Sequence, residues 1–183
     1  MGVTIHYTIA YENKDALIRV LKAVAKVYSK YLIQELVCDE RRGIIEVAFQ
    51  VHPKAETLTF RFYNWKKWKN SDEWAIECLR EWVRKNYTNK YNVFWDEWAE
   101  LWICKDFCKT QFAGTQAHVI VAEIIRKVAM FASFAYIVDE GEYYETLNTD
   151  KVDEYIAQID AMINTLANAF KRMGFNVKTG DEL

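Results

Sequence analysis

Polar side chains suited to acid–base or ligand-binding chemistry gather in residues 107–146. This stretch holds a lysine–glutamine pair, a histidine and a group of carboxylates and tyrosines. With His52 from earlier in the chain, the candidate ligand-binding residues are Lys109, Gln111, His118, Glu140, Tyr144 and Glu145. Histidine beside carboxylates can act as acid and base in hydrolysis. The sequence therefore predicts a polar site here, although no motif names a reaction.

A small anion is one ligand that this stretch could hold. Lys109 and Gln111 project from the same side if their segment is extended. Gly114 and Thr115 are typical of a helix start, and the free amides of a first helical turn attract carboxylate or phosphate groups. The alternative interpretation is a solvated lysine next to a structural helix cap.

A divalent metal ion is the second candidate, with His52, His118 and Glu145 as possible ligands. The histidines lack close ligand spacing, and an isolated histidine is more often satisfied by a hydrogen bond than by an ion. We read 139–146 as a strand with a turn or bulge at Gly141, which places Tyr143 and Glu145 on one face. Its carboxylates then suit either a paired-acid catalytic site or a charged hairpin that discourages edge pairing.

The seven tryptophans all lie between positions 65 and 102. Trp65, Lys66, Lys67 and Trp68 interleave aromatic rings with bases, a pattern that can stack on single-stranded nucleic acid or form a face for a protein partner. The formal net charge of −2 gives no global reason to expect nucleic acid or an anionic membrane. The short patch therefore favours a protein partner.

Hydrophobic periodicity defines the elements that would position these residues. Alternating or β-rich runs predict strands over 3–10, 31–38, 45–51, 58–62, 93–108 and 133–138. Helical spacing predicts helices that start after Asn13, after Ser71, at Thr115 as N-cap and at Asp150 as cap, with Val152, Tyr155, Ile156, Ile159, Ile163, Leu166 and Phe170 on the apolar face of the last one.

These elements predict an α+β fold in a single domain over residues 1–183, with a Trp-rich helical insert at about 64–92. An antiparallel or mixed sheet of about six strands would carry three or four helices. Residues 17–40 and 118–140 echo one another as helix, strand and acidic turn, which suggests two related β-α-β halves.

Composition predicts an ordinary folded protein, with 51% hydrophobic and 27% charged residues. The apolar run 119–138 is interrupted by Glu123, Arg126 and Lys127, so it does not predict a membrane span. The N-terminus lacks the pattern of a signal peptide. Four scattered cysteines suggest thiols in a reducing compartment, so we expect a cytoplasmic protein.

Several short segments resemble those of an uncharacterised prokaryotic protein family. They are Ile5-His6-Tyr7, His52-Pro53, Lys109–Ala113, His118 and the run from Asp139 to Glu145. The resemblance covers the first strand, residues near 43–62 and 105–160, but not the Trp-rich insert. The family has no established activity, so the resemblance marks positions of interest without giving them a role.

The leading hypothesis is thus a cytoplasmic protein with a small polar or anionic ligand pocket. One alternative is a hydrolytic, possibly metal-assisted enzyme that uses the same residues. The other is an interaction module, and a homo-oligomer is compatible with each.

Overall fold

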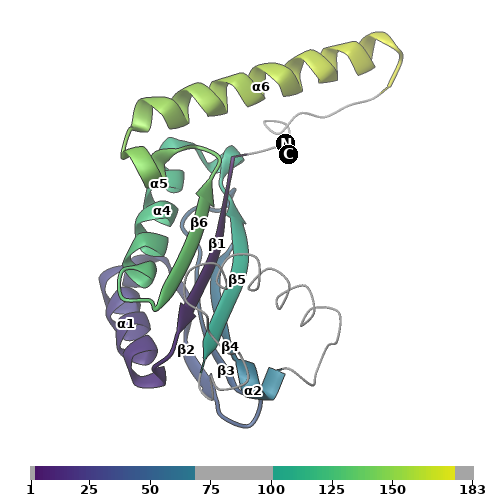
Figure 1. The fold of residues 1–183 in the computed structure, drawn as a ribbon. Coiled ribbons are helices and arrows are strands. Elements are labelled where there is room, and N and C mark those ends of the chain that lie inside the picture. Colours follow the sequence, from purple (N-terminus) through teal and green to yellow (C-terminus); the bar gives the residue numbers. More distant parts are fainter. Residues whose placement is uncertain (1–2, 69–100, 176–183) are drawn as a thin grey trace, which may run out of the picture.

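The computed structural model describes residues 3–68 and 101–175, which form one antiparallel sheet and the helices around it (Figure 1). Its strands are β1 (Thr4–Tyr11), β2 (Leu32–Asp39), β3 (Ile44–Phe49), β4 (Leu58–Asn64), β5 (Trp102–Lys109) and β6 (Phe134–Asp139). Its α-helices are α1 (Lys14–Val27), α2 (Trp65–Trp68), α4 (Thr115–Ala129), α5 (Tyr143–Thr146) and α6 (Thr149–Arg172). Short 3₁₀ turns occupy Ser29–Tyr31 and Gln111–Ala113.

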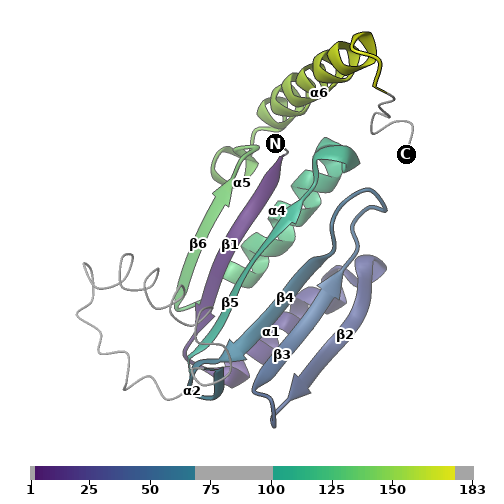
Figure 2. The ribbon, with the colours of Figure 1, turned by 90° about the vertical axis from the view of Figure 1, so that its right-hand side faces the viewer.

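The strand order is β2-β3-β4-β5-β1-β6, and every neighbouring pair is antiparallel. It follows that α4 joins two parallel strands, β5 and β6, that flank β1. In the same way α1 joins the parallel strands β1 and β2, which three other strands separate. Both helices cover one face of the sheet, as Figure 2 shows from the opposite face. The predicted α+β class, with an antiparallel sheet, is confirmed.

The sheet and these two helices enclose the hydrophobic core. In β1, Ile5, Tyr7, Ile9 and Tyr11 alternate towards the helices and are fully buried. Leu17 and Leu21 of α1 pack on this layer, as do apolar residues of α4. These apolar positions recur with the period-two and period-3.6 spacing of the sequence pattern, although Thr4, Thr8 and Ala10 on the other face of β1 are buried as well.

Strands β2, β3 and β4 are joined to strands β5, β1 and β6 by a short pairing between β4 and β5. Their pairing covers Tyr63 with Ile103 and Asn64 with Trp102. The backbone N–H of Trp65 also donates to the carbonyl of Leu101 at 2.8 Å. The chain thus leaves the sheet after β4 and returns to it for β5 at neighbouring points.

The long helix α6 stands apart from this body. Val152 is buried and Ile156 packs against the core, so the first turns of α6 are anchored. The rest of the helix extends beyond the end of the sheet (Figures 1 and 2). None of the helices within the described ranges combines the length and apolar character needed to cross a bilayer.

Local details differ from the sequence predictions in three places. Residues 139–146 form a turn and α5 instead of a strand, so Tyr143 and Glu145 do not share a strand face. Helix α4 is capped by the backbone of Gly114, while the Thr115 hydroxyl donates to Asp153. Helix α6 is capped by Asn148, whose side chain accepts from Asp150 N at 2.9 Å. The helix expected after Ser71, the first part of the strand predicted over 93–108 and most of the Trp-rich insert lie outside the described residues.

Candidate functional site

The predicted site residues gather at one end of the sheet, where β1 starts and β5 and β6 end. Thr110 N donates to Val3 O at 3.0 Å, and Glu140 N donates to Thr4 O at 3.1 Å. These backbone bonds fix the chain after β5 and after β6 on either side of β1. The start of α4 is joined to the same end through the turn at 111–113.

A buried hydrogen-bonded row runs through this end: Thr110, His118 and Asp139. The Thr110 hydroxyl lies 2.7 Å from His118 Nδ1, and His118 Nε2 lies 2.9 Å from Asp139 Oδ1. Thr110 and His118 are fully buried. Because a carboxylate only accepts, Nε2 carries a proton, and in the neutral tautomer Nδ1 is an acceptor for the Thr110 hydroxyl, whose oxygen also lies 3.3 Å from a second acceptor, the carbonyl of Val3. The order hydroxyl, imidazole, carboxylate is that of a nucleophilic triad, but this hydroxyl faces no solvent.

Asp139 is the hub of this row. Its side chain also accepts hydrogen bonds from Gly141 N and Tyr144 N, each at 2.8 Å. Burial raises the pKa of Asp139, but the bonds from His118 and the two backbone amides outweigh it, so the net pKa lies below the ordinary value. The charged carboxylate therefore holds the turn that leads into α5.

Gly141 packs directly against the histidine. A Cβ atom added to it would meet His118 Nε2, His118 Cε1 and a methyl carbon of Val3. The missing side chain therefore makes room for the imidazole, which explains why glycine stands within the Asp-Glu-Gly segment.

Glu140, by contrast, points to the open face of the sheet. Its Oε2 accepts from Thr4 N at 2.9 Å, and its Oε1 lies 3.9 Å from His6 Nε2. The His6 ring is 5.8 Å from the ring of Phe107, centroid to centroid. Because neighbouring residues of a strand alternate between faces, the side chains of Asp139 and Glu140 lie on opposite faces of the sheet.

Lys109 and His52 belong to the same end but not to the buried row. Lys109 is the Cα partner of Thr4 in the β1–β5 pairing, and its backbone N–H donates to Glu56 Oε2 at 3.0 Å. His52 lies in the loop between β3 and β4, where its Nδ1 accepts from Lys54 N at 3.1 Å. Each side chain is partly exposed.

Gln111 is buried, and within the described residues its amide nitrogen has no hydrogen-bond partner. This donor is of the kind that the predicted anion site requires. The same region already has a negative group, because Asp153 of α6 accepts from the hydroxyl of Thr115 in the first turn of α4. A carboxylate from the chain itself therefore serves the positive end of the helix.

Tyr144 and Glu145 complete the predicted set within α5. The Tyr144 ring stacks under the guanidinium of Arg126, which lies 4.8 Å from the ring centroid, and the Tyr144 carbonyl accepts from the same arginine. Glu145 is exposed. Tyr144 meets the row through its backbone, since its N–H donates to Asp139, whereas its ring packs on Arg126.

The structure thus joins His118 to Thr110 and Asp139, two residues that the sequence prediction did not select. Within residues 3–68 and 101–175, no group of three or more His, Cys, Asp or Glu side chains is placed to hold a metal ion. The possible metal ligands His52, His118 and Glu145 each lie in a different environment.

The residues of the predicted Trp/Lys interaction face also differ in their exposure to solvent. Trp65 is buried, whereas Lys66 and Lys67 are exposed, and the Lys67 ammonium donates to the carbonyl of Glu40. Nothing can be said of the Trp68 side chain, which lies outside the described set.

No protein-family model matches the sequence, and neither curated proteins nor solved structures gave a match.

Proposed function

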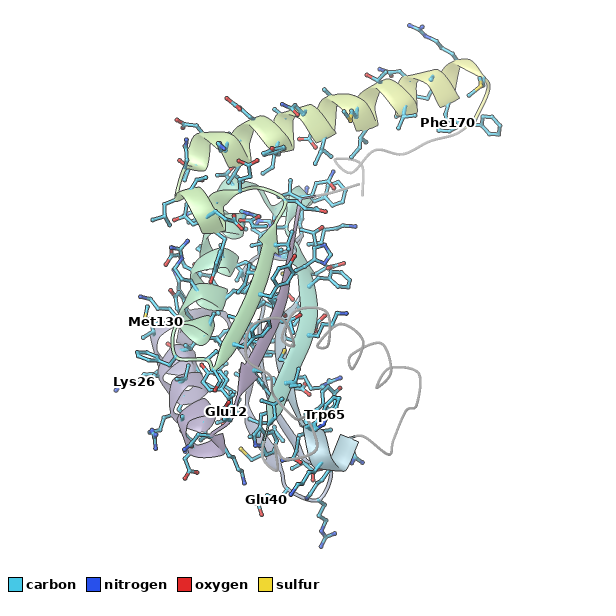
Figure 3. The ribbon with its side chains drawn as sticks, viewed as in Figure 1. Glu12, Lys26, Glu40, Trp65, Met130 and Phe170 are labelled. Atoms are coloured by element: carbon cyan, nitrogen blue, oxygen red, sulfur yellow. The ribbon has the colours of Figure 1, made fainter. Side chains whose placement is uncertain are left out.

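We propose that this protein is an interaction module that assembles with a second copy of itself through α6. The observation that carries the proposal is an apolar stripe along the part of α6 that extends past the sheet. The side chains of Met162, Leu166 and Phe170 on α6, and of Met173 just after it, are 42–62% exposed. Figure 3 shows Phe170 near the far end of the helix, away from the sheet.

The stripe follows a seven-residue repeat. Val152, Ile159, Leu166 and Met173 are each seven positions apart, and so are Ile156, Ile163 and Phe170. A seven-residue apolar repeat keeps one face turned towards a partner helix, as in coiled coils. The first members of the repeat are buried against α4 and α5, which leaves the later members for another chain.

The charges of α6 favour an antiparallel arrangement with a second copy. Asp150, Asp153, Glu154 and Asp160 lie in its first half, and Lys171 and Arg172 lie at its end. An antiparallel pair over residues 159–173 sets Asp160 of each helix beside Lys171 and Arg172 of the other, and it also opposes their helix dipoles. A parallel pair would place like charges together.

The segment of α6 over which two copies could pair is short. Residues 159–173 span about 21 Å of helix at 1.5 Å per residue. A standard stable interface buries about 800 Å² per partner, so a contact of this length predicts reversible, concentration-dependent pairing.

Sedimentation velocity over a range of concentrations tests the proposal. We expect the weight-average sedimentation coefficient of the wild-type protein to rise with concentration. In the double variant Leu166→Glu/Phe170→Glu it should stay at the monomer value, because pairing would bury two charges. The matched control, Ala161→Glu/Asn168→Glu, places two carboxylates on the opposite, exposed face and should behave as wild type.

A wild-type protein that remains monomeric at every concentration would refute the proposal. So would a control variant that loses pairing to the same extent as the stripe variant. Circular dichroism of all variants establishes that each one folds.

The ligand-pocket and hydrolytic-enzyme hypotheses stay predictions, as does the family resemblance. The burial of the Thr110 hydroxyl and of both His118 nitrogens supports a structural role for this row. At this end of the sheet, the feature that supports a ligand site is the side-chain amide nitrogen of Gln111, which has no hydrogen-bond partner among the described residues.

A further inference from the structure

The outer surface of the helical layer carries a second apolar feature, distant from the stripe of α6. Val27, at the end of α1, is 72% exposed, and Met130 and Phe131, in the turn after α4, are 55% and 68% exposed. Figure 3 shows Met130 and Lys26 on the same outer side of the two helices. We call the surface around these three apolar residues the outer helical face.

A groove of about 260 Å³ between α1 and α4 joins these residues. Its walls are almost entirely apolar and include Val20, Ala23 and Val24 of α1 as well as Val27, Met130 and Phe131. Large exposed apolar patches on folded proteins mark interaction sites, so we expect this groove to bind a partner.

Cations surround the groove. Arg19 and Lys127 line it, and Lys22, Lys26 and Lys30 are exposed on or just after α1. Among the described residues, none of these five forms a recorded ion pair. Helix α1 itself carries four basic residues against one acid, Asp15. The carboxylate of Glu123, the nearest acid on α4, already lies beside Arg126 and Tyr143.

We propose that the outer helical face docks on an anionic lipid bilayer surface. Phe131 and Met130 would enter the boundary between headgroups and acyl chains, while the surrounding lysines contact lipid phosphates and carboxylates. Exposed apolar residues ringed by Lys and Arg are the chemistry of interfacial membrane binding. The proposal is independent of pairing through α6.

The charges also decide against a second copy as the occupant. Two identical outer faces would bring like charges together, which opposes association. The exposed part of α6 ends in Lys171 and Arg172, so it does not complement this surface either. An anionic bilayer satisfies both the cations and the apolar residues.

The net charge of the whole chain does not reveal the cations of the outer helical face. The net charge of −2 predicts no anionic membrane partner, because it sums acids and bases from every face of the molecule. Membrane attraction depends instead on charges within about one Debye length of the bilayer.

Vesicle co-sedimentation tests the proposal with full-length protein. We expect binding to vesicles of phosphatidylcholine mixed with phosphatidylserine, little binding to phosphatidylcholine alone, and release as the salt concentration rises. Met130→Ser/Phe131→Ser should weaken binding by roughly tenfold or more, since each side chain loses its transfer from water. Lys22→Gln/Lys26→Gln should weaken it by roughly fivefold per lysine.

The matched controls are Ile33→Ser, which removes an apolar side chain that is 59% exposed on β2, and Lys54→Gln, in the β3–β4 loop. Both should bind vesicles as wild type does. The proposal fails if the wild type ignores anionic vesicles at low salt, or if the Met130/Phe131 variant binds as well as the controls. It also fails if the protein ignores vesicles and binds an acidic amphipathic peptide, which would make this face a protein-docking surface.

Discussion

A Cβ atom placed on Gly141 would stand 2.7 Å from Nε2 of His118, closer than Cβ atoms come to a neighbouring heavy atom in folded proteins. The same Nε2 donates to Asp139, so any shift of the imidazole also disturbs the hydrogen bond that holds the turn at 139–144. The glycine, the histidine and the aspartate therefore form one packed unit at the end of β6.

The first prediction concerns this packing. Gly141→Ala should lower the free energy of unfolding by about 1–3 kcal/mol, the usual cost of overpacking a buried site. Urea denaturation measures it. In a His118→Ala background the ring is absent, so the added cost of Gly141→Ala should largely disappear, giving a coupling energy in the double-mutant cycle. Equal costs in both backgrounds would show that the strain lies elsewhere.

The second prediction concerns pH. Hydrogen bonds to Asp139 hold its pKa below the ordinary value despite the opposing effect of burial. The charged form therefore stabilises the fold above the unfolded-state pKa of about 3.9, and this contribution is lost as pH falls through the lower pKa of the folded state. Asp139→Asn should be less stable than wild type at neutral pH, and the difference should shrink in acid.

Urea titrations between neutral and acidic pH measure this difference. Glu35→Gln, at an exposed position of β2, provides the control and should track the wild type throughout. A stability difference between wild type and Asp139→Asn that stays constant down to the acid limit would contradict the assignment.

The third prediction concerns the thiols. Burial raises the pKa of Cys104 well above the ordinary range and that of Cys108 to about 12, so neither forms much thiolate near neutrality. Cys38 is exposed. Alkylation of the native protein followed by peptide mass mapping should modify Cys38 and leave Cys104 and Cys108 intact. Urea should make both reactive, and rapid labelling of Cys108 in the native state would contradict its burial.

Much of the fold could be predicted from periodicity. The alternation of Ile5, Tyr7 and Ile9 and the helical spacing of Leu17 and Leu21 both recur as buried faces, because side-chain direction repeats with the backbone. The pairing order could not be read in this way. It depends on which strands meet across the chain, and the position of β1 between β5 and β6 leaves no local signal.

The wrong strand at 139–146 has a local cause. The Asp139 side chain accepts from Gly141 N and Tyr144 N and turns the backbone. Aspartate is known to compete with regular structure in this way. Sequence periodicity does not reveal whether the N–H groups of Gly141 and Tyr144 will donate to this carboxylate or to a neighbouring strand.

The candidate site stays a prediction, and the structure shows only how its residues are arranged. His118 stands out as a polar residue in an apolar helix, and its burial matches that signal. Its partner is Asp139, whereas the candidate ligand-binding residues include Glu140 and Glu145. The alternation of β6 decides between them: residue 138 is on the open face and pairs with His6, so residue 139 turns inward.

The bond between Trp65 N and Leu101 O has a consequence for how the chain connects the sheet. Because β4 and β5 pair at this joint, the residues on either side of the Trp-rich stretch are held together. The order of β4 beside β5 is thereby set by contacts at the ends of these two strands.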